Sequence, residues 1–287
     1  MADVKRVLIV NSEIFPYLPE SDIARIGRYL PQGVQERKRE IRAFMPRYGC
    51  INERKNQLHE VIRLSGMNII ISDVDRPLII KVASISAARI QVYFIDNEDY
   101  FRRKQTYCAD DGTFFADNDE RAIFFARGVL ETVKKLRWYP DVIHLHGWVG
   151  MLVGLYVKVL YKDEPAYRNS RIVVSLYDDD SFDAPFCDDF FERLRTKVMP
   201  AFDTEGIATP VTCTELFKLA VKYSDGVIIN APKVDEEVVS YARQTGKPVL
   251  DYPGEADYYS ACNDFYTLVC GGDDGDEEEE SFIIPRK

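Results

Sequence analysis

Two kinds of hydrophobic pattern alternate along the chain. Short continuous apolar runs are typical of buried parallel strands, and they occur at residues 5–11, 41–45, 141–144, 171–177 and 226–230. Other segments place their apolar residues at helical spacing, at residues 21–39, 118–138, 147–161, 214–223 and 235–245. This alternation of strand and helix predicts an α/β fold, a doubly wound, Rossmann-like parallel sheet.

One part of the chain departs from this alternation. Three strand-like runs follow one another without a helical segment between them, at residues 68–72, 78–83 and 89–95. Closely spaced strands of this kind indicate antiparallel pairing. We therefore expect a small antiparallel β insert within the βα chain.

The sequence ends in an acidic segment. Residues 273–280 include seven Asp and Glu residues, and Phe282, Ile283 and Ile284 follow them. We predict one Rossmann-like domain over residues 1–270 and an acidic tail over 271–287, too poor in apolar residues to fold alone. Two interpretations of residues 282–284 remain open: a frayed terminus, or a tethered peptide that packs in an apolar groove of this chain or of another molecule.

Composition limits the class of protein. The 287 residues are 46% hydrophobic, which is enough for a large core. The net charge is −10, so we expect neither a concentrated basic face nor a nucleic-acid partner. The sequence holds neither a signal-like N-terminus nor an apolar run long enough to span a membrane, and we expect a cytoplasmic protein without a membrane partner. The six cysteines form no C-x-x-C pair and are expected to be reduced core thiols.

Ligands of doubly wound sheets bind at the carboxyl ends of the strands, so residues that follow strands are the first candidates. In PDVIHLHGW, residues 140–148, His144 and His146 would share one face if the strand continues. A histidine there acts as an acid or base, or binds a sugar hydroxyl. The alternative is a structural histidine bonded to a neighbouring carbonyl group.

Two acidic motifs offer further candidates. In FADNDER, residues 115–121, Asp117 or Asn118 is a natural helix cap with Arg121 one turn inside, and the functional alternative is a carboxylate that binds hydroxyl groups. The cluster at residues 178–180 and 183–189 suits either a divalent metal ion or a solvated loop, and we expect the loop and no metal. The sequence matches neither G-x-G-x-x-G nor a P-loop, and no cofactor is expected.

Several stretches, in order, resemble the motifs of one family. They are KRVLIVNSEIFP (5–16) with Leu30-Pro31, FMPRYGC (44–50), residues 92–130, PDVIHLHGW (140–148) and LFKLAVKYSDGVIINAP (216–232). Over about residues 4–245 the chain resembles the N-terminal half of bacterial glycogen (starch) synthase, glycosyltransferase family five.

The resemblance implies half of a GT-B-type transferase, which moves glucose from ADP- or UDP-glucose to an α-1,4-glucan with retention and without a metal. The Rossmann-like half holds the acceptor glucan, and the other half holds the nucleotide. His146 matches the family's active-site histidine, and Asp117 matches its acceptor-side aspartate. Asn118, Tyr93 and Trp148 match neighbouring positions.

The chain also departs from the family's pattern. The family's phosphate-gripping Lys-x-Gly-Gly-Leu is replaced by Pro19–Ile23, which places two acids where a diphosphate would sit and so repels it. The family's H-D-W triplet is His146-Gly147-Trp148, and its second His-Asn pair is Tyr177-Asp178. Tyr177 is thus the candidate at that substrate-binding position.

Because of these departures, two hypotheses about the function remain open. Residues 246–287 are too few for a second Rossmann domain, so we expect the chain to lack the side chains that hold the diphosphate. One hypothesis is a pseudoenzyme, a non-catalytic binding or regulatory module. Its ligand would be an α-glucan, a nucleotide sugar, or a protein partner docked on the uncovered domain face. The alternative is a glycosyltransferase completed by a partner chain or by a homo-oligomer. In either case His146, Trp148, Asp117 and Asn118 should line one cleft.

Overall fold

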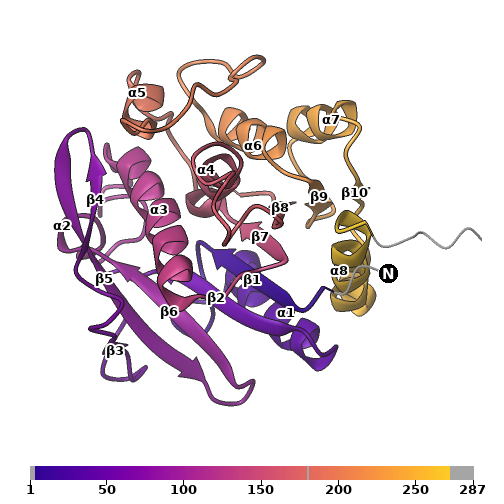
Figure 1. Cartoon of the computed structure of the whole chain (residues 1–287), viewed down its shortest axis with the longest axis horizontal. Coiled ribbons are helices and arrows are strands. Elements are labelled where there is room, and N and C mark those ends of the chain that lie inside the picture. Colours follow the sequence, from indigo (N-terminus) through magenta and orange to yellow (C-terminus); the bar gives the residue numbers. More distant parts are fainter. Residues whose placement is uncertain (1–3, 180, 272–287) are drawn as a thin grey trace, which may run out of the picture.

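The computed structural model describes residues 4–179 and 181–271. Its strands form one mixed sheet in the order β10-β9-β8-β7-β1-β2-β6-β5-β3, with β4 paired to β5 (Figure 1). The parallel strands are β1 (Arg6–Asn11), β2 (Glu40–Pro46), β6 (Ile90–Asp96), β7 (Val142–His146), β8 (Arg171–Leu176), β9 (Gly226–Ile229) and β10 (Val249–Leu250). The antiparallel strands are β3 (His59–Glu60), β4 (Met67–Ile71) and β5 (Val74–Ile85).

Helices cover both faces of the parallel part of the sheet. On one face α1 (Asp22–Glu36) packs beside α8 (Gly254–Val269). On the other face lie α3 (Asn118–Leu136), α4 (Leu152–Val159) and α6 (Cys213–Lys222), and α7 (Glu236–Gln244) packs against α6. The short helices are α2 (Glu98–Phe101), α5 (Phe190–Leu194) and the 3₁₀ turn η1 (Trp148–Gly150). The predicted doubly wound α/β fold is therefore confirmed.

The antiparallel strands differ from the prediction in one respect. The run at 89–95 was expected to belong to an insert, but it forms β6, which pairs in parallel with β2 and antiparallel to β5. One strand is thus shared by the parallel and the antiparallel parts. The insert extends the main sheet because the edge of β6 supplies the hydrogen-bonding groups that β5 needs.

Other helix and strand boundaries differ from those expected from the sequence, for local reasons. The strand expected at 141–144 runs on to His146. The single helix expected over 147–161 divides into η1 and α4. The helical segment starts only after Gly147, which takes a positive φ of 72°. A side chain at Gly147 would meet the Ser12 hydroxyl at 2.5 Å, so only glycine fits between the two strand ends. The sequence pattern did not predict α8, whose mixed polar and aromatic surface obscures its period.

The strand order reverses between β1 and β7, the central strands. From β1 the chain continues through β2 to β6 on one side, and then returns to β7 on the other side of β1. The carboxyl ends of these two strands are joined by a hydrogen bond from the Ser12 backbone N–H to the His146 carbonyl, at 2.9 Å. A reversal of this kind leaves a crevice beyond the strand ends, where ligands of such folds bind.

Three further expectations from the sequence concern the acidic tail, membrane-spanning segments and the cysteines. The tail at 272–287, with Phe282–Ile284, lies outside the described residues. No helix in the described part of the chain is both long and apolar enough to cross a lipid bilayer. The six cysteines are free of disulfides, but only Cys262 is fully buried and Cys50 is exposed, so the expectation of core thiols holds for Cys262 and is wrong for Cys50.

Candidate functional site

The candidate site centres on His146, the last residue of β7. Its side chain is fully buried, and its Nδ1 lies 2.7 Å from the Tyr177 hydroxyl, so the structure brings these two candidates together. Its Nε2 is buried and has no hydrogen-bond partner in the described part of the chain. Burial lowers the pKa of His146 to about 3, because the charged ring would lose its hydration. The ring is therefore a neutral imidazole at ordinary pH.

His144 lies beside His146, as the period-two spacing predicts. The centroids of the two rings are 3.9 Å apart. His144 Nδ1 is 2.7 Å from the Tyr266 hydroxyl, and its Nε2 is 2.6 Å from Ser175 Oγ. Burial, and then the neighbouring His146, hold the pKa of His144 well below its ordinary value. With both nitrogens bonded, His144 is a structural histidine, the alternative considered for this motif.

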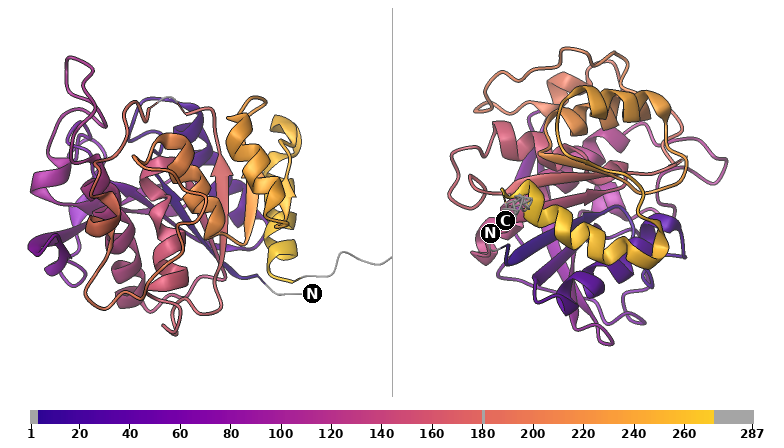
Figure 2. Two further views of the ribbon diagram at one scale, coloured as in Figure 1. Left: turned by 90° about the horizontal axis from the view of Figure 1, so that it is seen from above. Right: turned by 90° about the vertical axis from the view of Figure 1, so that its right-hand side faces the viewer.

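Helix α8 is the cover of this histidine pair. Figure 2 shows α8, in yellow, lying across the face of the sheet beside α1. Its residues Tyr258, Cys262 and Tyr266 recur every fourth position and are all buried. Tyr266 reaches His144 from this helix, across 122 positions of sequence. The sequence analysis missed this contact because no local pattern marks a pairing over that distance.

Trp148 closes the opposite side of the strand ends. It is fully buried, and its Nε1 donates to Ser181 Oγ at 3.1 Å. Its ring packs against Tyr107 and Phe182, with centroids 5.1 Å away in each case. In this conformation Trp148 is thus a core residue beneath two loops, with no face presented to solvent.

Asp117 and Asn118 begin α3, as expected, but neither acts as a simple cap. Asp117 occupies the N-cap position without a capping bond and instead forms two hydrogen bonds of 2.6 Å with Arg103. Asn118 is buried, donates to the Tyr107 carbonyl at 2.9 Å and accepts from Arg121. Tyr107 thereby links the start of α3 to Trp148.

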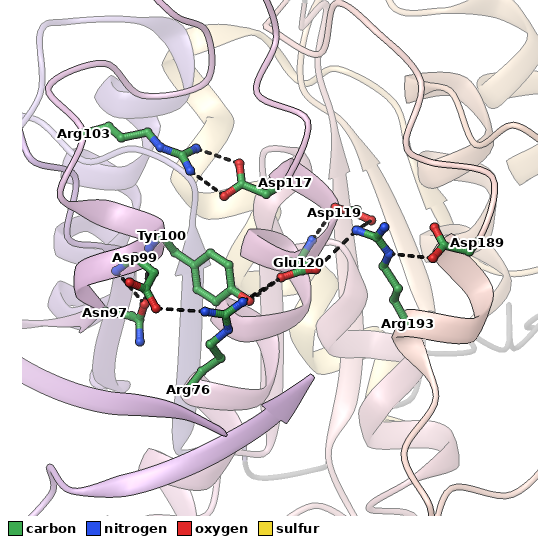
Figure 3. A network of polar contacts seen from close by, with 10 residues as sticks. All are labelled: Arg76, Asn97, Asp99, Tyr100, Arg103, Asp117, Asp119, Glu120, Asp189 and Arg193. Carbon is green, nitrogen blue, oxygen red and sulfur yellow. Dashed lines mark hydrogen bonds and ion pairs between the residues drawn. The ribbon is translucent and has the colours of Figure 1, made fainter. Parts of the chain in front are cut away.

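The acids that follow on α3 are also paired. Figure 3 shows Asp119 and Glu120 facing Arg193, which lies 3.4 Å and 3.2 Å from them. The Tyr100 hydroxyl donates to Glu120 at 2.6 Å, and Arg76 lies 3.6 Å from the same carboxylate. The network joins β5, α2, α3 and α5, which favours a structural role for FADNDER. Arg103 and Arg193 were not singled out in the sequence, because each lies in an irregular or short segment.

Tyr93 does not join this group. It lies within β6, stacks on Phe44, and its hydroxyl accepts from Arg42 at 3.0 Å and donates to Gln91 at 3.1 Å. Arg42 also lies over the ring of Trp138, which precedes β7. The Tyr93 hydroxyl therefore serves contacts toward the amino ends of the strands, away from His146.

A cleft of about 750 Å³ lies above the strand ends, lined by residues of the loops at 13–21, 104–108 and 181–183. At its wall, Ser21 caps α1 by accepting from the Ala24 N–H and donates to Glu13 at 2.6 Å. The Tyr107 hydroxyl also donates to Glu13, and burial raises the pKa of that carboxyl group. The first turn of α1 is thus already capped, with Glu13, Glu20 and Asp22 around it. This is the opposite of a phosphate-binding helix start, which presents free N–H groups and no acids.

The acidic loop after β8 uses one of its described carboxylates for contacts within the loop. Asp179 accepts from the Ser181 backbone N–H at 3.0 Å and from its hydroxyl at 2.6 Å. Asp180 lies outside the described residues. Across 4–179 and 181–271, no group of three or more His, Cys, Asp or Glu side chains is placed to hold a metal ion.

The fold is that of the Rossmann-like half of a GT-B-type glycosyltransferase. The Arabidopsis thaliana starch synthase IV catalytic domain, solved with ADP and acarbose, superposes with a TM-score of 0.68. That match covers 87% of this chain and 51% of the other at 16% identity, so it supports the fold alone.

Sequence comparison gives the family. Residues 6–250 match the model of the starch synthase catalytic domain. Glycogen synthase of Chlorobaculum tepidum is 32% identical over 273 residues, which cover 94% of this chain and 53% of that protein. Glycogen synthase of Chlorobium luteolum is 36% identical over 176 residues, 60% of this chain and 35% of that protein. The chain belongs to the starch synthase catalytic domain family, glycosyltransferase family five, and the resemblance seen in the sequence is confirmed. The chain spans about half the length of the curated relatives it matches, or less.

Proposed function

We propose that this domain is a non-catalytic member of its family that binds α-glucan. The observation that carries the proposal is the state of His146, which is sealed from solvent, bonded to Tyr177 and held neutral. A residue that binds substrate must be able to touch it. In this conformation His146 has no surface with which to do so.

The start of α1 supports the same conclusion. Transfer of a sugar from a nucleotide requires stabilisation of the diphosphate as it leaves. Ser21 and Glu13 already bond the helix start, and Glu20 and Asp22 add like charge. These residues repel a diphosphate, whereas they leave a neutral glucan unaffected.

A transfer assay tests the absence of catalysis. We expect the purified 287-residue chain to incorporate no labelled glucose from ADP-glucose or UDP-glucose into glycogen. The glycogen synthase of Chlorobaculum tepidum is the positive control under the same conditions. Sustained incorporation by this chain that is abolished in His146→Ala would overturn the proposal.

A co-sedimentation assay tests glucan binding. We expect the chain to sediment with glycogen but not with dextran, whose linkage differs. Loss of the interaction on addition of maltotriose would support recognition of α-1,4-linked glucose. If the chain stays in the supernatant with glycogen at every concentration, it is not a glucan-binding module.

A second candidate is a glycosyltransferase completed in trans by a partner chain or by a second copy. It is favoured by the pairing of His146 with Tyr177 at the end of β7, which a pure binding module does not require. Mixing the chain with the isolated C-terminal domain of a related glycogen synthase distinguishes the two. Transfer that appears only in the mixture and is lost in His146→Ala favours the transferase.

A further inference from the structure

The amino ends of five adjacent parallel strands form an edge of the sheet that is rich in basic side chains. The residues that open these strands, or directly precede them, are Lys5 and Arg6 at β1, Arg39 and Glu40 at β2, Asp141 at β7, Arg171 at β8 and Asp225 at β9. Arg37 and Lys38 lie in the turn before β2 and are exposed. On this amino-end edge, six bases thus stand against three acids. The net charge of the chain did not predict this local excess of bases.

The three acids of the amino-end edge are already bonded. Glu40 pairs with Arg6 at 3.2 Å. Asp141 accepts from two backbone N–H groups at the start of β1, at 2.8 Å and 2.9 Å. Asp225 lies 2.6 Å from Lys158 Nζ, a base from outside this edge. These carboxylates are therefore not available to balance the remaining bases.

Three consecutive bases, Arg37, Lys38 and Arg39, form no ion pair with an acidic side chain in residues 4–179 and 181–271. The Arg37 guanidinium donates to a backbone carbonyl of α1 at 2.8 Å. Arg39 donates to Asn263 Oδ1 and to Thr267 Oγ1 of α8, both at 3.0 Å. These acceptors are neutral, so the cluster keeps its positive charge.

Helix α8 ends at the amino-end edge. Figure 2 shows the end of α8 beside the start of β1, and Arg39 joins the two by bonding to Thr267 and to the Val4 carbonyl. Burial raises the pKa of the Cys270 thiol to about 11, and the charges of Asp141 and Arg171 act on the same thiol. The chain therefore leaves α8 among the bases of this edge.

The sequence that follows α8 is strongly acidic. Residues 273–280 include seven Asp and Glu residues, and Asp273 is only two positions beyond Gly271, a reach of roughly 7 Å. Strands β8 and β2 are three strand spacings apart, about 14 Å. Eight residues of extended chain span up to about 28 Å. The acidic segment is thus long enough to contact Arg171 and the cluster at 37–39 together.

We propose that residues 273–280 dock on the amino-end edge of their own chain and pair with Arg37, Lys38 and Arg171. Opposite charges brought within contact distance attract, and the edge offers bases without acidic partners. The docked segment covers bases that would otherwise attract another polyanion. The edge lies at the opposite ends of the strands from the strand-end cleft, so the inference does not depend on the proposed function.

Carbodiimide cross-linking of the full chain, followed by mass spectrometry, tests the proposal. We expect cross-links from the carboxylates of residues 273–280 to the Lys38 amine at low salt. They should fall about fivefold at about 1 M salt, where the screening length is about 3 Å. Lys104 is the control amine, because it is exposed and lines the strand-end cleft, and we expect few cross-links to it at either salt concentration.

A double variant tests the role of the neighbouring bases. Arg37→Gln combined with Arg171→Gln removes two partners and keeps Lys38 as the reporter, so we expect about threefold fewer cross-links to Lys38. Arg102→Gln is the matched control, since the Arg102 side chain is 78% exposed and lies outside the amino-end edge, and it should behave as the wild type. Thermal melting of each variant shows whether the fold is intact.

Two outcomes would overturn the inference. If cross-links to Lys38 are unchanged by salt and by the double variant, the segment does not pair with the edge. If a mixture of isotope-labelled and unlabelled chains gives mainly cross-links between the two, the acidic segment docks on a second copy and not on its own chain.

Discussion

At the scale of single residues, the site is governed by burial of imidazole. His144 and His146 are enclosed by the sheet, α1 and α8, and both are held neutral. His59, the third histidine of the chain, is exposed. Two of the three histidines are therefore shielded from solvent, and the third is not.

This burial predicts a pH dependence of stability. Between pH 6.5 and about 3, the unfolded chain protonates His146 while the folded chain does not, so the free energy of unfolding falls as the pH falls. We expect His146→Gln to remove about 2 kcal/mol of the loss between pH 7.5 and pH 5. Urea unfolding at the two pH values measures it.

His59→Gln is the control for this experiment, because His59 is exposed and lies outside the buried histidine pair. We expect its loss of stability on acidification to equal that of the wild type. Equal losses in His146→Gln and His59→Gln would mean that His146 is accessible to protons in the folded chain.

At the scale of elements, α8 determines the environment of the histidine pair. Its face of Tyr258, Cys262 and Tyr266 packs on β7, β8 and β9, where Gly226 leaves room for Phe265. A side chain at Gly226 would approach the Phe265 ring to 2.9 Å. Close approach of helix and sheet is what excludes water from His144.

Two tyrosines of α8 provide a matched pair of substitutions. Tyr266→Phe removes the hydroxyl bonded to His144 Nδ1 and leaves a buried nitrogen unpaired. We expect the variant to lose about 1–3 kcal/mol of unfolding free energy. Tyr258→Phe removes a hydroxyl whose side-chain partner is the weakly hydrogen-bonding Cys262 thiol, and it should change stability by less than about 0.5 kcal/mol. Denaturant unfolding of the two variants is compared with that of the wild type. Equal losses of unfolding free energy would contradict the hydrogen bond assigned between Tyr266 and His144.

At the scale of the whole molecule, the domain is larger than the matched family region. The match ends at residue 250, whereas buried side chains continue through α8 to Tyr266. Tyr258, Cys262, Phe265 and Tyr266 all belong to the core. Side chains of α8 thus pack into the same core, and the domain boundary at residue 270 stays a prediction.

Two truncations test this boundary. A chain ending at residue 251 loses α8 and exposes the apolar face of β9 and the two histidines, so we expect aggregation or loss of cooperative melting. A chain ending at residue 271 loses only the acidic segment and should melt within a few degrees of the full chain. A large drop in the second melting temperature would instead favour the tethered-peptide interpretation of residues 282–284.

Much of the fold was predictable from the sequence, because local patterns carry it. The runs that became β1, β2, β7, β8 and β9 are continuous and apolar, since parallel strands are covered on both faces. The spacing of His144 and His146 correctly gave a shared face. The order of motifs gave the family, which residues 6–250 then matched.

The sequence by itself determined the strands, most helices and the identity of the residues at the strand ends. Only the tertiary structure decided what those residues touch. Asp117 meets Arg103, Tyr93 faces the amino ends of the strands, and His144 bonds to a helix that the pattern did not predict. The physical reason is range: hydrophobic periodicity acts within an element, whereas burial and pairing depend on side chains brought from distant positions, as Tyr266 is to His144.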